Sequence, residues 1–161
     1  MPCTNLIGEE NKGFGGIMIN FNAERLYIAA SANAFAMVCM DEAVAWARQR
    51  KTFGTRLLDH QVIRHKVAEM AKRILATQAF LETTTWKMQQ GERPVTELSL
   101  LKIQATETME YCAREAVQIF GGMGFMRGTK VERIYREVRV NAIGGGSEEI
   151  MRDLAARQLA L

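Results

Sequence analysis

Residues 96–120 read TELSLLKIQATETMEYCAREAVQIF, and this stretch decides the fold. Its apolar and small residues recur at steps of three and four, which is the spacing of one helix face. This face is formed by Leu98, Leu101, Ala105, Met109, Cys112, Ala116 and Ile119. Such a seam is typical of a helix that packs inside a bundle, and Thr96 is the candidate N-cap.

Two further helical patterns precede this seam. The first runs from about Ala23 to Arg50, and its broad apolar face comprises Leu26, Ala30, Ala34, Val38 and Ala45. The second starts after Asp59, a candidate N-cap, and runs to about Gln90. Its apolar face comprises Ile63, Val67, Met70, Ile74 and Leu81. Spacings of three, four and seven residues predict helices here too.

Glycine-rich turns separate the remaining helices. A short helix with Val131, Ile134, Tyr135 and Val138 follows the seam. The last helix starts at Ser147, and its apolar stripe comprises Ile150, Leu154 and Leu159. We find neither a period-two strand pattern nor a repeat, so we predict an all-α antiparallel four-helix-type bundle with extra short helices. Residues 1–16, rich in turn formers, are expected to be a connector, and residues 17–161 the bundle domain.

Composition limits the class of protein. The 161 residues are 48% hydrophobic and 24% charged, as expected of one globular domain. No apolar run is long enough for a membrane span, and the start does not read as a signal peptide. The net charge of +3 argues against a nucleic-acid partner. Three cysteines without metal spacing and 2 histidines predict no metal site and a reducing, intracellular compartment.

Four places could carry chemistry. Glu24 begins the long helix, where an acid is most often only favourable to the helix dipole. A basic corner surrounds residues 52–54 and comprises Arg48, Arg50, Lys51, Arg56, Arg64, His65 and Lys66. It is either a solvated turn or a site for pyrophosphate, with Phe53 as an anchor for a flat group. One aromatic residue is too few for a platform that stacks single-stranded nucleic acid.

The other two places are glycine turns. QIFGGMGF at 118–125 ends a helix with more glycines than a cap needs, which indicates close approach of a ligand or another chain. GGGSEE at 144–149 enters a helix, where free N–H groups suit an anion or a carbonyl oxygen. Ser147 as a plain N-cap before first-turn acids also explains this second turn. No strand precedes it, so it is not a dinucleotide fingerprint.

Taken together and in order, these motifs resemble the C-terminal helical domain of flavin-dependent acyl-CoA dehydrogenases. The resemblance rests on RKTFG at 50–54, HQ at 60–61, QIFGGMGF at 118–125 and IGGGSEEI at 143–150. It covers nearly the whole chain and implies a piece of a longer protein with an N-terminal helical domain and a middle β domain. The first residues then resemble the exit from that β domain.

The resemblance implies an FAD cofactor between the β domain and the bundle. Its adenine and pyrophosphate would reach the bundle of a neighbouring subunit, so a homo-oligomer, a dimer or tetramer, is expected. The residues that match cofactor-contacting positions are Arg50, Lys51, Thr52, Phe53, Gln61, Gln118, Ile119, Phe120, Gly121, Gly122, Ser147 and Glu149. Many relatives carry glutamine at the position of Glu149, so the acid there is a departure.

The implied reaction is α,β-dehydrogenation of an acyl-CoA thioester: a carboxylate removes the α proton and hydride passes to FAD. Many members carry this carboxylate at the position of Gly145, which has no side chain here. Isovaleryl-CoA and long-chain acyl-CoA dehydrogenases carry it on the first bundle helix, and Glu24 matches that position. The Gly145 N–H would bind the thioester carbonyl, with Gly144, Asn22 and Arg25 nearby. Arg25 could instead pair with a structural acid.

An electron-transferring flavoprotein is the acceptor that the resemblance implies, and the cytoplasm or the mitochondrial matrix is the expected compartment. Two alternatives remain open at this point. The scaffold could carry a divergent flavin chemistry, such as nitroalkane oxidation or monooxygenation. The chain could also be a non-catalytic helical oligomerisation module. The isolated fragment is expected to be inactive, because it lacks most of the cofactor and substrate site of the whole enzyme.

Overall fold

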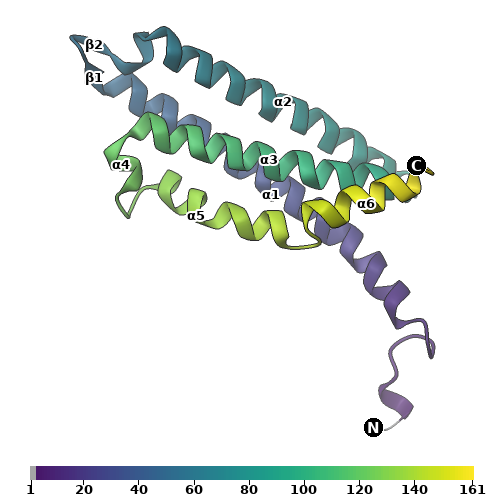
Figure 1. Ribbon diagram of the computed structural model, residues 1–161. Coiled ribbons are helices and arrows are strands. Elements are labelled where there is room, and N and C mark those ends of the chain that lie inside the picture. The colour runs from purple at the N-terminus through teal and green to yellow at the C-terminus, as the bar shows by residue number, and fades with distance from the viewer. Residues whose placement is uncertain (1–2) are drawn as a thin grey trace.

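A computed structural model describes residues 3–161 and confirms the all-α class (Figure 1). In chain order the elements are the 3-10 helix η1 (Cys3–Asn5), α1 (Gly13–Gln49), β1 (Lys51–Thr52), β2 (Thr55–Arg56), the 3-10 helix η2 (Leu57–Asp59), α2 (Gln61–Gln89), α3 (Val95–Phe120), α4 (Gly122–Phe125), α5 (Lys130–Ile143) and α6 (Glu148–Gln158). Helix α3 lies at the centre of the bundle, in contact with α1, α2, α5 and α6.

The central position of α3 follows from its seam. Every residue of the predicted face is buried, from Leu98 at the start to Ile119 at the end. The face continues almost the full length of the helix, so neighbours pack along all of it. The prediction of Thr96 as the N-cap is wrong. Helix α3 begins at Val95 with Pro94 as its N-cap residue, so Thr96 lies inside the first turn.

Helix α1 departs most from the expectation. It begins at Gly13 and not near Ala23, and its first turns project from the bundle (Figure 1). The expected face is wrong, because Ala34 and Ala45 are exposed. The buried stripe comprises Arg25, Ala29, Ala32, Asn33, Ala36, Cys39, Ala43 and Ala47. Small apolar residues surround the whole helix, so the sequence offers little contrast from which to assign the buried side.

Helix α1 is also long and apolar enough to cross a membrane by length and composition. Core helices of bundles satisfy the same criterion, and α1 packs against α2, α3 and α5. Its small buried side chains allow close approach of α3. We therefore interpret α1 as a core helix.

The other helices show smaller differences. Asp59 is not the cap of α2: it ends η2, and its carboxylate accepts two hydrogen bonds from Arg56, at 2.9 and 3.1 Å. In α5 the predicted face is confirmed except for Tyr135, which is half-exposed. In α6 the buried residues are Met151 and Ala155, so the predicted stripe is displaced by one position.

A small hairpin between α1 and α2 was not predicted. Strands β1 and β2 pair antiparallel, with Thr52 opposite Thr55. The two turn residues, Phe53 and Gly54, both have positive φ (52° and 84°), as the tightest hairpin turns require. Strands of two residues are too short to show an alternating pattern, which is why the sequence did not reveal them.

The turn between α3 and α4 supplies a stability prediction. A Cβ at Gly124 would lie 2.6 Å from the Val117 carbonyl oxygen and 3.0 Å from Phe120 Cβ. We expect Gly124→Ala to lower the free energy of unfolding by about 2 kcal/mol, because backbone must move. Thermal unfolding checks this, with Gly122→Ala as the control, since a Cβ there meets nothing within 4 Å. Equal melting temperatures for the two variants would contradict the assignment.

Candidate functional site

The first part of the candidate site lies where α1 passes the glycine loop between α5 and α6. Arg25 is 4% exposed; its Nε donates to the Gly145 carbonyl oxygen at 3.0 Å, and its Nη1 donates to Asn22 Oδ1 at 3.2 Å. Burial lowers the pKa of Arg25, while the nearby Glu24 carboxylate opposes this shift. The structure therefore brings together the predicted residues Asn22, Glu24, Arg25 and Gly145. It favours a structural role for Arg25. The partners of its guanidinium are a backbone carbonyl and a side-chain amide and not the acid that the sequence suggested.

Glu24 itself is exposed on α1. Its Oε1 accepts a hydrogen bond of 2.6 Å from Asn20 Nδ2, one helical turn earlier. This contact orients the carboxylate, and the next residue along the helix holds the glycine loop. The exposure of Glu24 differs from the closed apolar surroundings that raise the pKa of a buried catalytic carboxylate.

The backbone conformation of the loop favours glycine at positions 145 and 146. Gly145 has a φ of +69°, and a Cβ there would lie 2.9 Å from Ile28 Cδ1 and 3.7 Å from Arg25 Cγ. A side chain at this position would therefore require both strained backbone and displacement of Ile28. Gly146 has a φ of +118°, and its Cβ would lie 2.5 Å from Met151 Cε. The loop is thus packed tightly on α1 and α6.

Sequence reasoning missed one residue of this site. Lys102, on α3, is fully buried, and its Nζ donates to the carbonyl oxygens of Ala142 and of Gly146, the latter at 2.7 Å. Burial lowers its pKa to about 8, while Glu148 and Glu149 raise it and Arg25 lowers it further. Its signal in the sequence was a lysine within an otherwise apolar part of α3, next to Leu101 of the seam.

Ser147 and Glu149 lie at this same end of the bundle. Ser147 is the N-cap residue of α6, as predicted, although its side chain makes no cap hydrogen bond. The pKa of Glu149 is lowered, first by its own backbone N–H and then by the Ser147 hydroxyl. Both groups are therefore close to the helix N-terminus, which favours a negative charge.

A pocket of about 530 Å³ opens at the other end of the bundle. It lies between the C-terminal end of α1, the hairpin and the turn from α3 to α4. Its lining residues are Trp46, Arg50, Thr52, Leu57, Ile119, Phe120, Gly121, Gly122, Met123 and Met126. Trp46 and Phe120 stack with ring centroids 4.9 Å apart, which gives the pocket a flat aromatic wall. Six of the twelve predicted cofactor-contacting residues are thus brought together here: Arg50, Thr52, Ile119, Phe120, Gly121 and Gly122.

The other six predicted residues do not line this pocket, and two of them, Ser147 and Glu149, lie at the glycine-loop end of the bundle. Lys51, Gln61 and Gln118 are exposed beside it, and Phe53 is 98% exposed at the hairpin tip. The hairpin itself is held by His60, whose Nε2 lies 3.1 Å from Thr52 Oγ1 and 3.3 Å from Thr55 Oγ1. The exposed residues face outward, where a group bound by another chain could reach them.

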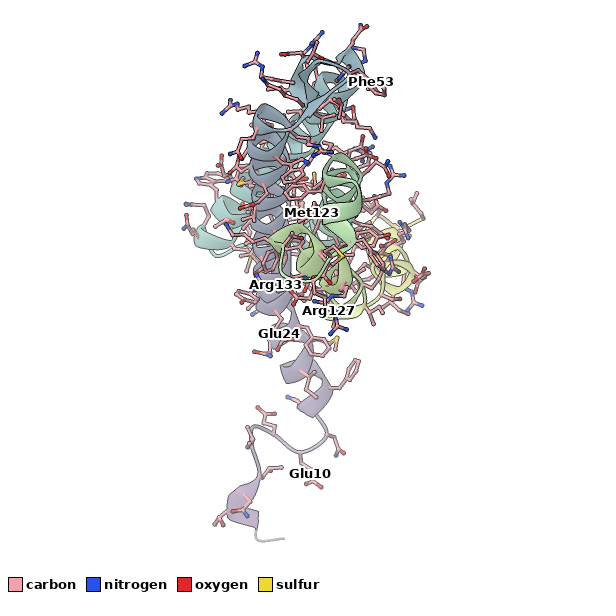
Figure 2. All side chains as sticks on the ribbon, turned by 90° about the vertical axis from the view of Figure 1, so that its left-hand side faces the viewer. Glu10, Glu24, Phe53, Met123, Arg127 and Arg133 are labelled. Carbon is pink, nitrogen blue, oxygen red and sulfur yellow. The ribbon has the colours of Figure 1, made fainter. Side chains whose placement is uncertain are left out.

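The two parts of the candidate site are far apart. Figure 2 shows Phe53 at one end of the molecule, Glu24 toward the other and Met123 between them. The stretch of α1 from Glu24 to Arg50 is about 40 Å long at about 1.5 Å per residue. The two groups of predicted residues therefore lie toward opposite ends of the bundle.

Sequence comparison identifies the family. The family model described as "Acyl-CoA dehydrogenase, C-terminal domain" matches residues 11–160. The chain belongs to the acyl-CoA dehydrogenase family. An acyl-CoA dehydrogenase of Alternaria alternata is 40% identical over 98% of this chain and 39% of its own length. The mitochondrial long-chain specific acyl-CoA dehydrogenase of Rattus norvegicus is 35% identical over 99% of this chain and 37% of its own length.

Solved structures of this acyl-CoA dehydrogenase family share the fold. The crystal structure of acyl-CoA dehydrogenase from Geobacillus kaustophilus superposes with a TM-score of 0.97 and is 37% identical, covering 100% of this chain and 42% of that one. The chain therefore spans about two fifths of the length of the relatives it matches. Within residues 3–161, no group of three or more potential metal ligands lies together.

Proposed function

We propose that this chain is the C-terminal domain of a flavin-dependent acyl-CoA dehydrogenase, in which Glu24 is the general base. The observation that carries the proposal is the contact between Arg25 and the Gly145 carbonyl. Glu24 directly precedes Arg25 on α1, and Arg25 binds the loop position that has no side chain. We call the polypeptide that joins this domain to an N-terminal helical and a middle β domain the intact enzyme.

Two groups of this chain would act on the thioester. The Glu24 carboxylate would remove the α proton, oriented by its hydrogen bond from Asn20. The Gly145 N–H, which no hydrogen bond engages within the described part of the chain, would donate to the thioester carbonyl and stabilise developing enolate charge. Bound FAD supplies the acceptor for the β hydride. Glu24 is exposed in this domain, so the other domains of the intact enzyme would exclude water from it.

The pocket at the hairpin end fits part of an FAD molecule. Its aromatic wall of Trp46 and Phe120 suits a flat ring, and Arg50 offers a planar cation for pyrophosphate. A Cβ at Gly121 or Gly122 would meet nothing within 4 Å, so the backbone there is open to a ligand. Arg50, Thr52 and the 119–122 segment would therefore hold the cofactor's outer end.

The distance between the two ends supports a homo-oligomer. Since Glu24 and Arg50 lie toward opposite ends of the bundle, the hairpin pocket would serve the flavin of a neighbouring copy. Exposed Phe53 is suited to this contact, because it projects from the hairpin tip. We propose an electron-transferring flavoprotein as the acceptor, and the cytoplasm or the mitochondrial matrix as the compartment.

Reduction of the intact enzyme tests the proposal. The purified flavin-loaded protein is mixed anaerobically with a panel of straight, branched and long acyl-CoAs, and the absorbance of oxidised flavin is followed. Bleaching by a thioester is the expected result and identifies the substrate class. Bleaching by nitroalkanes alone, or by no thioester while flavin is bound, would replace the proposal with a divergent flavin chemistry.

Arg50 supplies a test of the cofactor pocket. We expect Arg50→Ala to weaken FAD binding to the intact enzyme about tenfold or more, because a hydrogen bond to a charged group contributes about 1.5–3 kcal/mol. Arg50 is exposed, so the melting temperature of the apoprotein should not change. Arg48→Ala is the matched control, since Arg48 lies on the same helix end but outside the pocket lining. Equal loss of stability and flavin affinity in Arg50→Ala would contradict the assignment.

A further inference from the structure

We propose that Lys102 is a positioning residue for the reaction: from the centre of α3 it holds the glycine loop so that the Gly145 N–H is placed for the thioester carbonyl. The inference rests on the proposed function. Lys102 lies outside the residues that touch substrate or cofactor, and it acts only through the loop.

The contacts of the loop carry this inference. Buried cations hold two of its carbonyl groups, Gly145 by Arg25 and Gly146 by Lys102, and Lys102 also holds the Ala142 carbonyl in the last turn of α5. The two cations come from different helices, α3 and α1, both parts of the bundle core. The loop is therefore fixed to two rigid elements on either side of residue 145.

The burial of Lys102 indicates that these contacts matter. A fully buried lysine is unfavourable unless its ammonium group is hydrogen-bonded. Apart from Arg25, the charges that face it are the carboxylates of Glu148 and Glu149, on the first turn of α6. Among residues 3–161, Lys102 has no ion-pair partner at contact distance, and backbone carbonyls are its partners. An apolar residue would fill the same space without holding the loop.

The glycines make this support necessary. Gly145 and Gly146 both have positive φ, and glycine imposes the least conformational restriction of all residues. A peptide N–H in such a segment stays in one position only when tertiary contacts hold it. A displacement of about 1 Å at a reacting group can lower the rate about 100-fold. Loss of the Lys102 contacts would therefore affect catalysis from a distance.

The test compares Lys102→Met with wild type in the intact, flavin-loaded enzyme. The probe is a 3-thia-acyl-CoA, whose α proton can be removed but which is not dehydrogenated. Its enolate beside oxidised flavin gives a long-wavelength absorbance band, and titration of this band measures the apparent pKa of the bound α proton. Lys87→Met is the matched control, because Lys87 of α2 pairs with Glu97 of α3 and neither is among the residues predicted to bind substrate or cofactor.

We expect Lys102→Met to raise the pKa of the bound analogue's α proton by about one unit or more, a tenfold effect, and to lower kcat about 100-fold. Flavin content should stay unchanged, and Lys87→Met should behave as wild type. Lys102→Gln, which keeps N–H donors, should recover part of the loss.

If wild type ionises the analogue and Lys102→Met ionises it equally well, the inference is wrong. If wild type neither ionises the analogue nor is bleached by any acyl-CoA, the proposed function itself is wrong.

Hydrogen exchange in wild type gives a test that needs no variant. The Gly144 amide, at the start of the loop, donates to the Val140 carbonyl oxygen at 2.8 Å and should exchange slowly, whereas the amides of the exposed 53–54 turn should exchange fast. Slow exchange at the loop supports the inference if Lys102→Met proves too unstable to purify. Exchange of the loop at the rate of the hairpin turn would overturn it.

Discussion

Replacing Glu24 with glutamine should abolish turnover of the intact enzyme while FAD stays bound. Removal of a general base typically lowers the rate by about 10² to 10⁴-fold, since the amide cannot accept the α proton. The hairpin pocket that would hold the cofactor's outer end is about 40 Å away along α1, so flavin content should not change. Stopped-flow bleaching by an acyl-CoA measures the effect directly.

A control on the same helix makes this result specific. Asp41→Asn makes the same carboxylate-to-amide change at an exposed position of α1, and it should keep wild-type activity. Glu24→Asp should retain part of the rate, because a carboxylate remains but is set back by one methylene. If Glu24→Gln keeps most of kcat, Glu24 is only a structural acid in the first half of α1, and the base lies elsewhere.

The second large effect concerns Lys102, whose titration should raise the free energy of unfolding as the pH increases above 8. The pKa of Lys102 is about 8 in the folded chain, below the ordinary value of 10.5, because the charged form is buried. Between these two pH values Lys102 is mostly neutral in the folded chain and mostly protonated in the unfolded chain. The unfolded state therefore binds more protons, and the free energy of unfolding rises with pH. The shift predicts a rise of about 3 kcal/mol between pH 8 and pH 10.5.

Two buried thiols have the opposite effect on the free energy of unfolding as the pH rises. Burial raises the pKa of Cys39 and of Cys112 to about 12, so the unfolded chain loses these protons first as the pH rises above 9. Stability falls over that range for this reason. Urea unfolding of wild type and of Lys102→Met should therefore be compared at each pH, since the thiols are common to both. A difference that does not change between pH 7.5 and 10.5 would show that Lys102 does not titrate as a buried group.

The sequence predicted the seam of α3 and most of α5 correctly, because apolar and polar residues alternate there with a clear helical period. It failed on α1 and α6. In α1 nearly every position is small or apolar, so no side stands out; in α6 the buried Met151 and Ala155 lie one position from the expected stripe. The two-residue strands of the hairpin left no period to detect.

The sequence by itself determined the class of fold, the family and the list of residues that could bind and react, because those depend on local spacing and on motifs. Only the tertiary structure divided that list between two ends of the bundle, with Arg25 and Gly145 at one and Arg50 with the 119–122 segment at the other. It alone revealed Lys102 as a support of the loop. The physical reason is that these contacts join residues from different helices, and a hydrogen bond from a lysine to a carbonyl 44 positions away leaves no mark on local sequence.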